Sequence, residues 1–186
     1  MEKLTYTHNA DAAAVIAQAY DTPPLAYVRS YGCQQNVNDG EKIRGVLMDI
    51  GFGVCDSVEQ ADLILFNTCA VREHAEQRVF GNVGALKKLK EKNPRLIIGV
   101  CGCMAQQKHI VDKLRASYPY VDLVFGVDGI DRLPAMLVER LHRGKRYLET
   151  PVERNAVVAS NAIIQWFLSL SLLFLPFSGI LHSCIN

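Results

Sequence analysis

The sequence predicts an α/β fold, namely a flavodoxin-like open parallel sheet of about five strands with helices on both faces. Short apolar runs alternate along the chain with longer stretches in which apolar residues recur at helical spacing. The connections between them are short, and crossover helices are what parallel neighbouring strands require. One run, Asp62 to Asn67, is almost continuously apolar, which is typical of a strand buried on both faces.

The first third of the chain predicts a leader helix and then a strand–helix unit. An alanine-rich stretch, Asp11 to Tyr20, has high helix propensity and is expected to form a peripheral helix. Leu25 to Arg29 is predicted to be the first strand. Asn38 and Glu41 have the spacing of a capping box, so they predict the start of an amphipathic helix that ends near Gly51.

The rest of the domain repeats this alternation. The elements predicted after Gly51 are an edge strand at Phe52 to Cys55, the buried strand Asp62 to Asn67, a helix from Val71 to Lys92, a strand at Leu96 to Val100, a helix from Ala105 to Ser117, a strand at Val121 to Phe125, and a last helix with Asp131 as N-cap, Pro134 in its first turn and Gly144 at its end. Right-handed crossovers between these strands would make all of them point the same way.

Length and composition predict one main domain with an appendage. The 186 residues suffice for one well-buried core. The expected division is a leader at residues 1–24, the α/β domain at residues 25–150, and a linker stub with an apolar tail at residues 151–186. From Asn155 onward the tail contains no charged residue. The tail has three interpretations: a membrane span, a core helix, or a non-native or frame-shifted end. The composition favours the last of these, so we expect no membrane partner.

The charge and the cysteines of the chain bear on its binding partners and its location. Twenty basic and 19 acidic residues give a net charge of +1, which leaves no overall basic character for nucleic-acid binding. The six cysteines, together with a polar start that does not look like a signal peptide, predict a reducing, cytoplasmic location. In such a location clustered cysteines are more often metal ligands than disulfides.

Three cysteines occupy equivalent places in the predicted fold. Cys33, Cys69 and Cys103 each follow a predicted strand, and the carboxyl ends of parallel strands meet at one edge of the sheet. Each also precedes a predicted helix, whose N-terminus is expected to favour the thiolate. Three thiolates without a fourth ligand suit an iron–sulfur cluster with one open iron better than a closed zinc site. Buried structural cysteines remain the alternative.

The segments around these cysteines resemble a known family. They are Tyr31-Gly32-Cys33-Gln34-Gln35-Asn36, Asn67-Thr68-Cys69-Ala70-Val71-Arg72 and Gly102-Cys103-Met104-Ala105-Gln106. The three are similar, in order, to the cysteine motifs of the N-terminal domain of the radical-SAM methylthiotransferases, of the MiaB type that modifies tRNA. The resemblance extends from about Tyr27 to Asn155.

The resemblance implies a function for the cysteines. Cys33, Cys69 and Cys103 would bind an auxiliary 4Fe-4S cluster that holds the sulfur for transfer to carbon 2 of an isopentenylated adenosine near the anticodon of tRNA. Iron–sulfur assembly machinery and tRNA would be the partners. Asn36, Asn67, Thr68 and Gln106 would donate hydrogen bonds to sulfur, with helix capping as the alternative role.

The family's second cluster and its S-adenosylmethionine are bound through a CxxxCxxC motif, which this sequence lacks. We therefore expect the chain alone to be inactive, with no catalytic residue of its own. A different class of function stays open: a non-catalytic flavodoxin-like module that holds zinc or a redox-active cysteine pair, or that binds other proteins. Cys101 is expected to pack against a helix, and Cys55 to be structural or exposed. We expect the lysines from Lys87 to Lys92 to form a solvated helix face rather than an RNA contact.

Overall fold

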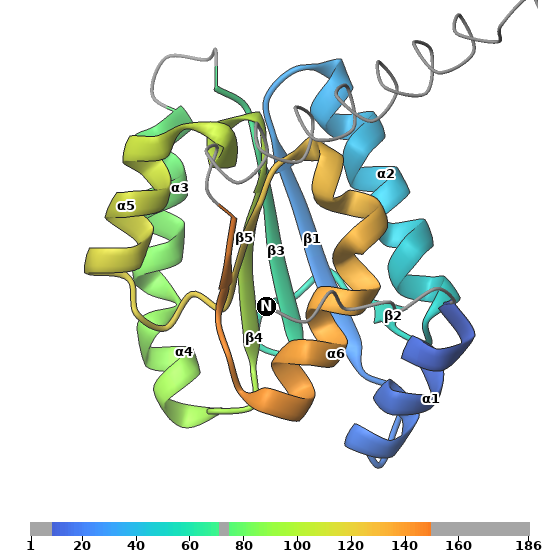
Figure 1. Cartoon of the computed structure of the whole chain (residues 1–186). Helices are drawn as coiled ribbons and strands as arrows, with labels where there is room; N and C mark the ends of the chain where they lie inside the picture. Colours follow the sequence, from blue (N-terminus) through green and yellow to red (C-terminus); the bar gives the residue numbers. More distant parts are fainter. Residues whose placement is uncertain (1–8, 71–74, 150–186) are drawn as a thin grey trace, which may run out of the picture. The chain divides into compact units, whose positions relative to one another are not determined.

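The structure, a computed structural model, describes residues 9–70 and 75–149. Its centre is a sheet of six strands in the order β2-β1-β3-β4-β5-β6, and every neighbouring pair is parallel (Figure 1). The strands are β1 (Leu25–Tyr31), β2 (Gly53–Val54), β3 (Leu63–Thr68), β4 (Ile97–Gly102), β5 (Leu123–Phe125) and β6 (Tyr147–Leu148). The predicted open parallel α/β sheet is confirmed, with β6 as a strand that the sequence did not indicate.

Helices cover both faces of this sheet, as Figure 1 shows. On one face lie α1 (Asn9–Ala19), α2 (Gln34–Asp49) and α6 (Leu133–Arg143). On the other lie α3 (Ala75–Ala85), α4 (Lys87–Lys92) and α5 (Lys108–Ser117). Two short 3-10 helices, η1 (Cys103–Gln106) and η2 (Val127–Arg132), follow β4 and β5.

The two central strands carry the core. All residues of β3 and β4 are buried, which confirms that the apolar run before Thr68 is covered on both faces. Because successive side chains of a strand point to opposite faces, Leu63 and Leu65 pack on the α2 and α6 side. Ile64 and Phe66 pack on the α3 and α5 side. Each such side chain contributes about 1.5–3 kcal/mol by leaving water, so β3 is held firmly in place.

The predicted capping box at Asn38 is wrong. Helix α2 begins at Gln34 with Cys33 as its N-cap, so Asn38 lies in its second turn. There the Oδ1 of Asn38 accepts a hydrogen bond from the Nε2 of Gln34, and Glu41 pairs with Arg44. The helix starts early because the chain reverses at Gly32, immediately after β1, and leaves no room for a polar loop.

Other helix boundaries also differ from the prediction. The helix expected from Ala105 begins at Lys108, because Ala105 belongs to η1. The long helix expected up to Lys92 is divided at Leu86 into α3 and α4, and its expected start at Val71 lies outside the described residues. The last helix has Arg132 rather than Asp131 as its N-cap, because Asp131 belongs to η2. The end of that helix agrees with the prediction, since Gly144 adopts a left-handed conformation with φ of 65°.

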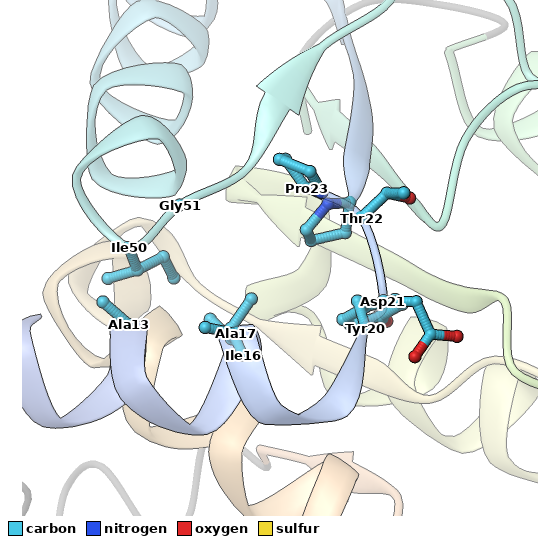
Figure 2. A pocket seen from close by; sticks show the side chains of 10 residues that line it. Ala13, Ile16, Ala17, Tyr20, Asp21, Thr22, Pro23, Ile50 and Gly51 are labelled. Carbon is cyan, nitrogen blue, oxygen red and sulfur yellow. The ribbon is translucent and has the colours of Figure 1, made fainter.

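The first helix was predicted to be peripheral, but it is part of the core. Ala12 and Ile16 of α1 are each 1% exposed and belong to the cluster formed with α2 and α6. A shallow hollow of about 260 Å³ remains where α1 approaches Ile50 and Gly51, lined mainly by apolar side chains such as Ala13 and Ala17 (Figure 2). It adjoins the prolines that precede β1 and so lies at the amino end of that strand.

The predicted division at residues 24/25 and 150/151 stays a prediction. The interpretations of the tail concern residues 151–186, which lie outside the described residues. Within residues 9–70 and 75–149, none of the helices has the length and apolar character needed to cross a membrane.

Candidate functional site

The three central strands end level with one another. In the register of the sheet, Tyr31 pairs with Thr68, and Thr68 pairs with Gly102. Cys69 and Cys103 follow these paired positions directly, and Cys33 follows two residues after Tyr31. The structure therefore brings all three predicted cysteines to the carboxyl edge of the sheet. The backbone N–H of Cys69 also donates to the carbonyl of Tyr31 at 3.0 Å, which ties the second turn to the first.

The three cysteines differ in their exposure to solvent. Cys33 is exposed, Cys103 is half-buried and Cys69 is only 4% exposed. None of the three is in a disulfide, and the same holds for the other cysteines in the described part of the chain. A group bound by all three would therefore be anchored in the protein on one side and open to solvent on the other.

The three thiols lie close enough to influence one another's ionisation. The pKa of the Cys103 thiol is raised above its usual value, first by burial and then by the neighbouring Cys69, Cys33 and Asp39. The expectation that helix N-termini favour the thiolate is thus wrong at Cys103. The helix that begins there, η1, is only four residues long, so burial outweighs any favourable charge at its start. A positive charge placed next to Cys103, such as that of a metal ion, would favour loss of the thiol proton.

Two glycines allow the turns to come together. Gly32 has φ of 146° and Gly102 has φ of 94°, values that residues with side chains rarely adopt. A Cβ on Gly32 would lie 2.4 Å from the Cβ of Cys69. A Cβ on Gly102 would lie 2.4 Å from the Oδ1 of Asn67. Without these glycines the cysteine turns could not approach as closely as they do.

A buried polar network lies beneath the turns. Asn36 and Asn67 are fully buried, and the Nδ2 of Asn36 donates to the Oδ1 of Asn67 at 3.3 Å. The Nδ2 of Asn67 donates in turn to the carbonyl of Asn36 at 2.7 Å and to the Oγ of Ser30 at 3.4 Å. The thiol of Cys33 donates to the Oδ1 of Asn36 at 3.2 Å.

These contacts differ in part from the predicted ones. Asn36 contacts a cysteine sulfur as an acceptor from the thiol rather than as a donor. Asn67 bonds to the Cys33 turn, and the Oγ1 of Thr68 donates to the carbonyl of Cys101 at 2.8 Å. The pattern Asn-Thr-Cys gave no signal for these partners, because they depend on which strands are adjacent.

The remaining described cysteines stand apart from the site. Cys101 is 1% exposed and packs in the cluster with α2 and α6, and burial strongly raises the pKa of its thiol. Cys55 is half-buried near β2, and its thiol donates to the carbonyl of Ser57 at 3.4 Å. The packing of Cys101 against helices agrees with the prediction.

An open groove adjoins the site on the side of Cys103. Its volume is about 660 Å³, and α2 and η2 form its walls. Four aspartates line it, namely Asp39, Asp49, Asp128 and Asp131, together with Lys42. The groove therefore presents mainly negative charge next to the half-buried thiol. Asp39 is buried at its base and accepts a hydrogen bond from the Nε2 of Gln35 at 2.9 Å.

The three cysteines supply the kind of ligand that an iron–sulfur cluster needs. In the described part of the chain, no three His, Cys, Asp or Glu side chains are arranged to hold one metal ion. A cluster makes a different demand, because each thiolate binds a different iron and the sulfurs stand farther apart. Three cysteines on neighbouring backbone turns, with one side of the site open to solvent, have the chemistry for such a cluster.

Comparison with known proteins identifies relatives of this chain. Residues 25–126 match the model of the uncharacterized protein family UPF0004. The chain is 46% identical over 132 residues to a tRNA-2-methylthio-N(6)-dimethylallyladenosine synthase of Caldicellulosiruptor saccharolyticus, and 51% identical over 116 residues to one of Thermoanaerobacter sp.. It is 50% identical over 113 residues to the protein of that name from Bacillus subtilis.

These alignments cover 71%, 62% and 61% of this chain but only 28%, 25% and 22% of the relatives, in the same order. The chain thus spans about a quarter of the length of the curated relatives that it matches. The family match at residues 25–126 includes strands β1 to β5 and the three cysteines.

Proposed function

The chain belongs to the UPF0004 family and is related to the N-terminal domain of tRNA methylthiotransferases, and from this premise we propose that it is the domain that binds an auxiliary 4Fe-4S cluster through Cys33, Cys69 and Cys103. The single observation that carries this proposal is the convergence of three cysteines, none of them in a disulfide, at one edge of the sheet. In the full-length enzyme, the domain would serve the addition of a methylthio group to an isopentenylated adenosine of tRNA.

The residues of the site have distinct parts in this proposal. Cys69, which is buried, anchors the cluster on the protein side, whereas Cys33 and Cys103 hold it from the flanks. With three protein ligands, the cluster would supply one iron able to carry the sulfur that is transferred. The chain itself binds, orients and partly shields the cluster, and we assign no catalytic residue to it.

The charges around the site suggest how a tRNA would approach. Phosphates would be repelled by the aspartates that line the groove beside Cys103, including Asp128 and Asp131. The other flank of the site, near the exposed Cys33, has the guanidinium of Arg29 stacked over the ring of Tyr31 at 5.3 Å. We therefore propose that the RNA reaches the cluster from the Cys33 side.

The reaction also needs S-adenosylmethionine and a second 4Fe-4S cluster, for which this sequence offers no CxxxCxxC motif. We propose that this chain by itself cleaves no S-adenosylmethionine, and that it acts in the cytoplasm with the iron–sulfur assembly machinery. Formation of 5′-deoxyadenosine by the purified, reconstituted chain would contradict the first part.

Anaerobic reconstitution with iron and sulfide tests the cluster directly. We expect about four irons and about four sulfides per chain, with the visible absorption of a 4Fe-4S cluster. Alanine at Cys33, Cys69 or Cys103 should abolish this, whereas Cys55→Ala should leave it unchanged, because Cys55 is near β2 and bonds to Ser57. Tight binding of zinc without sulfide would overturn the proposal and favour the non-catalytic alternative.

A further inference from the structure

Asn67 contacts all three cysteine turns. It lies two residues before Cys69 on β3, and its amide exchanges hydrogen bonds with Asn36, three residues after Cys33. Its Oδ1 also sits against Gly102, the residue before Cys103, where a Cβ would come within 2.4 Å. In the described structure, one buried side chain therefore lies among the three turns that carry the thiols.

We propose that Asn67 is a positioning residue that fixes the mutual placement of Cys33, Cys69 and Cys103. The proposal rests on the cluster-binding function given above and adds to it which residue keeps the site in shape. It follows from geometry: each thiol is on a separate turn, and Asn67 is the buried polar group that contacts the other two from the third.

The link to Cys33 is the most direct. Asn67 fixes the first turn of α2 by donating to the carbonyl of Asn36 at 2.7 Å and by accepting from its Nδ2. Asn36 in turn contacts the sulfur of Cys33 at 3.2 Å. The position of the most exposed ligand therefore depends, through one intermediate residue, on a side chain in the middle of the sheet.

The chemistry of the amide explains why an asparagine stands here. The site needs a donor for the Asn36 carbonyl and an acceptor for the Asn36 amide, and a carboxamide offers both from one short side chain. A leucine has similar size but offers neither, and it would leave both buried groups of Asn36 without these partners. The turn could then shift, even though the core remained filled.

The test compares Asn67→Leu with the control Asn38→Ala. Asn38 lies on α2, where it is exposed, and Gln34 is the side-chain partner described for it. After anaerobic reconstitution, we expect Asn67→Leu to bind the cluster about tenfold more weakly. We also expect the remaining clusters to show an altered electron paramagnetic resonance spectrum and a shifted midpoint potential, whereas Asn38→Ala matches the wild type in all three measurements.

A second measurement needs no cluster. Phenylarsine oxide condenses with two neighbouring thiols, forming two arsenic–sulfur bonds and releasing one water without any oxidation or reduction. The wild-type chain and Asn38→Ala should bind it with equal affinity, and Asn67→Leu about tenfold more weakly. Urea unfolding shows whether each variant is folded under the conditions of these measurements.

The outcomes separate the two proposals. If the wild type assembles no cluster while arsenical affinity still falls in Asn67→Leu, the cluster proposal fails and the positioning role of Asn67 stands. If Asn67→Leu is less stable to urea but matches the wild type in cluster affinity, spectrum, potential and arsenical binding, Asn67 is merely structural and the inference is overturned. If Asn67→Leu does not fold, Asn67→Ser and Asn36→Ala take its place with the same expected and overturning results.

Discussion

Replacement of Gly102 by alanine should destabilise the protein strongly and disturb the cysteine site. Gly102 has φ of 94° and ψ of −167°, a region that only glycine occupies readily, so any other residue costs about 1–3 kcal/mol there. The new Cβ would also lie 2.6 Å from the carbonyl oxygen and 2.8 Å from the nitrogen of Thr68. These are backbone atoms of a central strand and cannot move without disturbing its pairing.

The two effects can be combined. Overpacking of a filled site costs about another 1–3 kcal/mol, so we expect a total loss of about 4 kcal/mol in the free energy of unfolding. With a urea m-value of about 2 kcal/mol/M for a domain of this size, the midpoint should fall by about 2 M. The measurement is urea unfolding of the reduced, metal-free chain, followed by circular dichroism.

A matched glycine serves as the control. Gly45 lies within α2, and a Cβ there would meet nothing within 4 Å. Gly45→Ala should therefore stabilise the chain by about 0.5–1 kcal/mol, because alanine loses less conformational freedom in a helix. If Gly102→Ala unfolds within about 0.3 M of the wild-type midpoint, the argument from backbone conformation and close approach is refuted.

Three further predictions concern other parts of the structure. In the native, metal-free chain, iodoacetamide should modify the exposed Cys33 before Cys69, and Cys101 only after denaturation, which mass spectrometry of the labelled peptides would check. In the folded state the pKa values of the Cys101 and Cys103 thiols are raised above the ordinary 9.0, so the native chain keeps protons that the unfolded chain loses. The contribution to the free energy of unfolding should therefore be full below pH 9 and fall as the pH rises through and above 9. Urea unfolding between pH 8 and 10.5 measures this, and a flat profile would contradict it. Asp122→Ala should lower the free energy of unfolding by about 3 kcal/mol, because it leaves Lys90, Arg140 and the backbone N–H of Ile98 without their shared buried acceptor. The control Asp112→Ala breaks only exposed ion pairs, so it should change the free energy of unfolding by less than about 1 kcal/mol.

The sheet and the proximity of the three cysteines could be predicted from the sequence, because both depend on patterns within short segments. An apolar run such as Asp62 to Asn67 reveals a buried strand, and the parallel arrangement then brings the residues after such strands to one edge. The very short β6 was missed, since Tyr147 and Leu148 are half-buried and form too short a run to give a pattern.

What the sequence could not give were contacts between elements. Asn38 and Glu41 have the spacing of a capping box, but the chain reverses at Gly32 and α2 already begins at Gln34. The expected ionisation of Cys103 failed for a similar reason, because burial and adjacent thiols are properties of the assembled edge. The role of Asn67 depends on Asn36 and Gly102, which become its neighbours only when β1 and β4 pair with β3.

The level register of β1, β3 and β4 also determines which changes of length the site can tolerate. One residue added within a strand would advance its cysteine by about 3.3 Å and turn the side chain to the opposite face. An insertion in the loops at the other edge of the sheet, for example after Asn93, would leave all three strand ends in place. Among homologous chains, lengths should therefore vary freely at the amino edge and hardly at all between each strand and its cysteine, so that the sheet keeps the ligand spacing constant while its periphery changes.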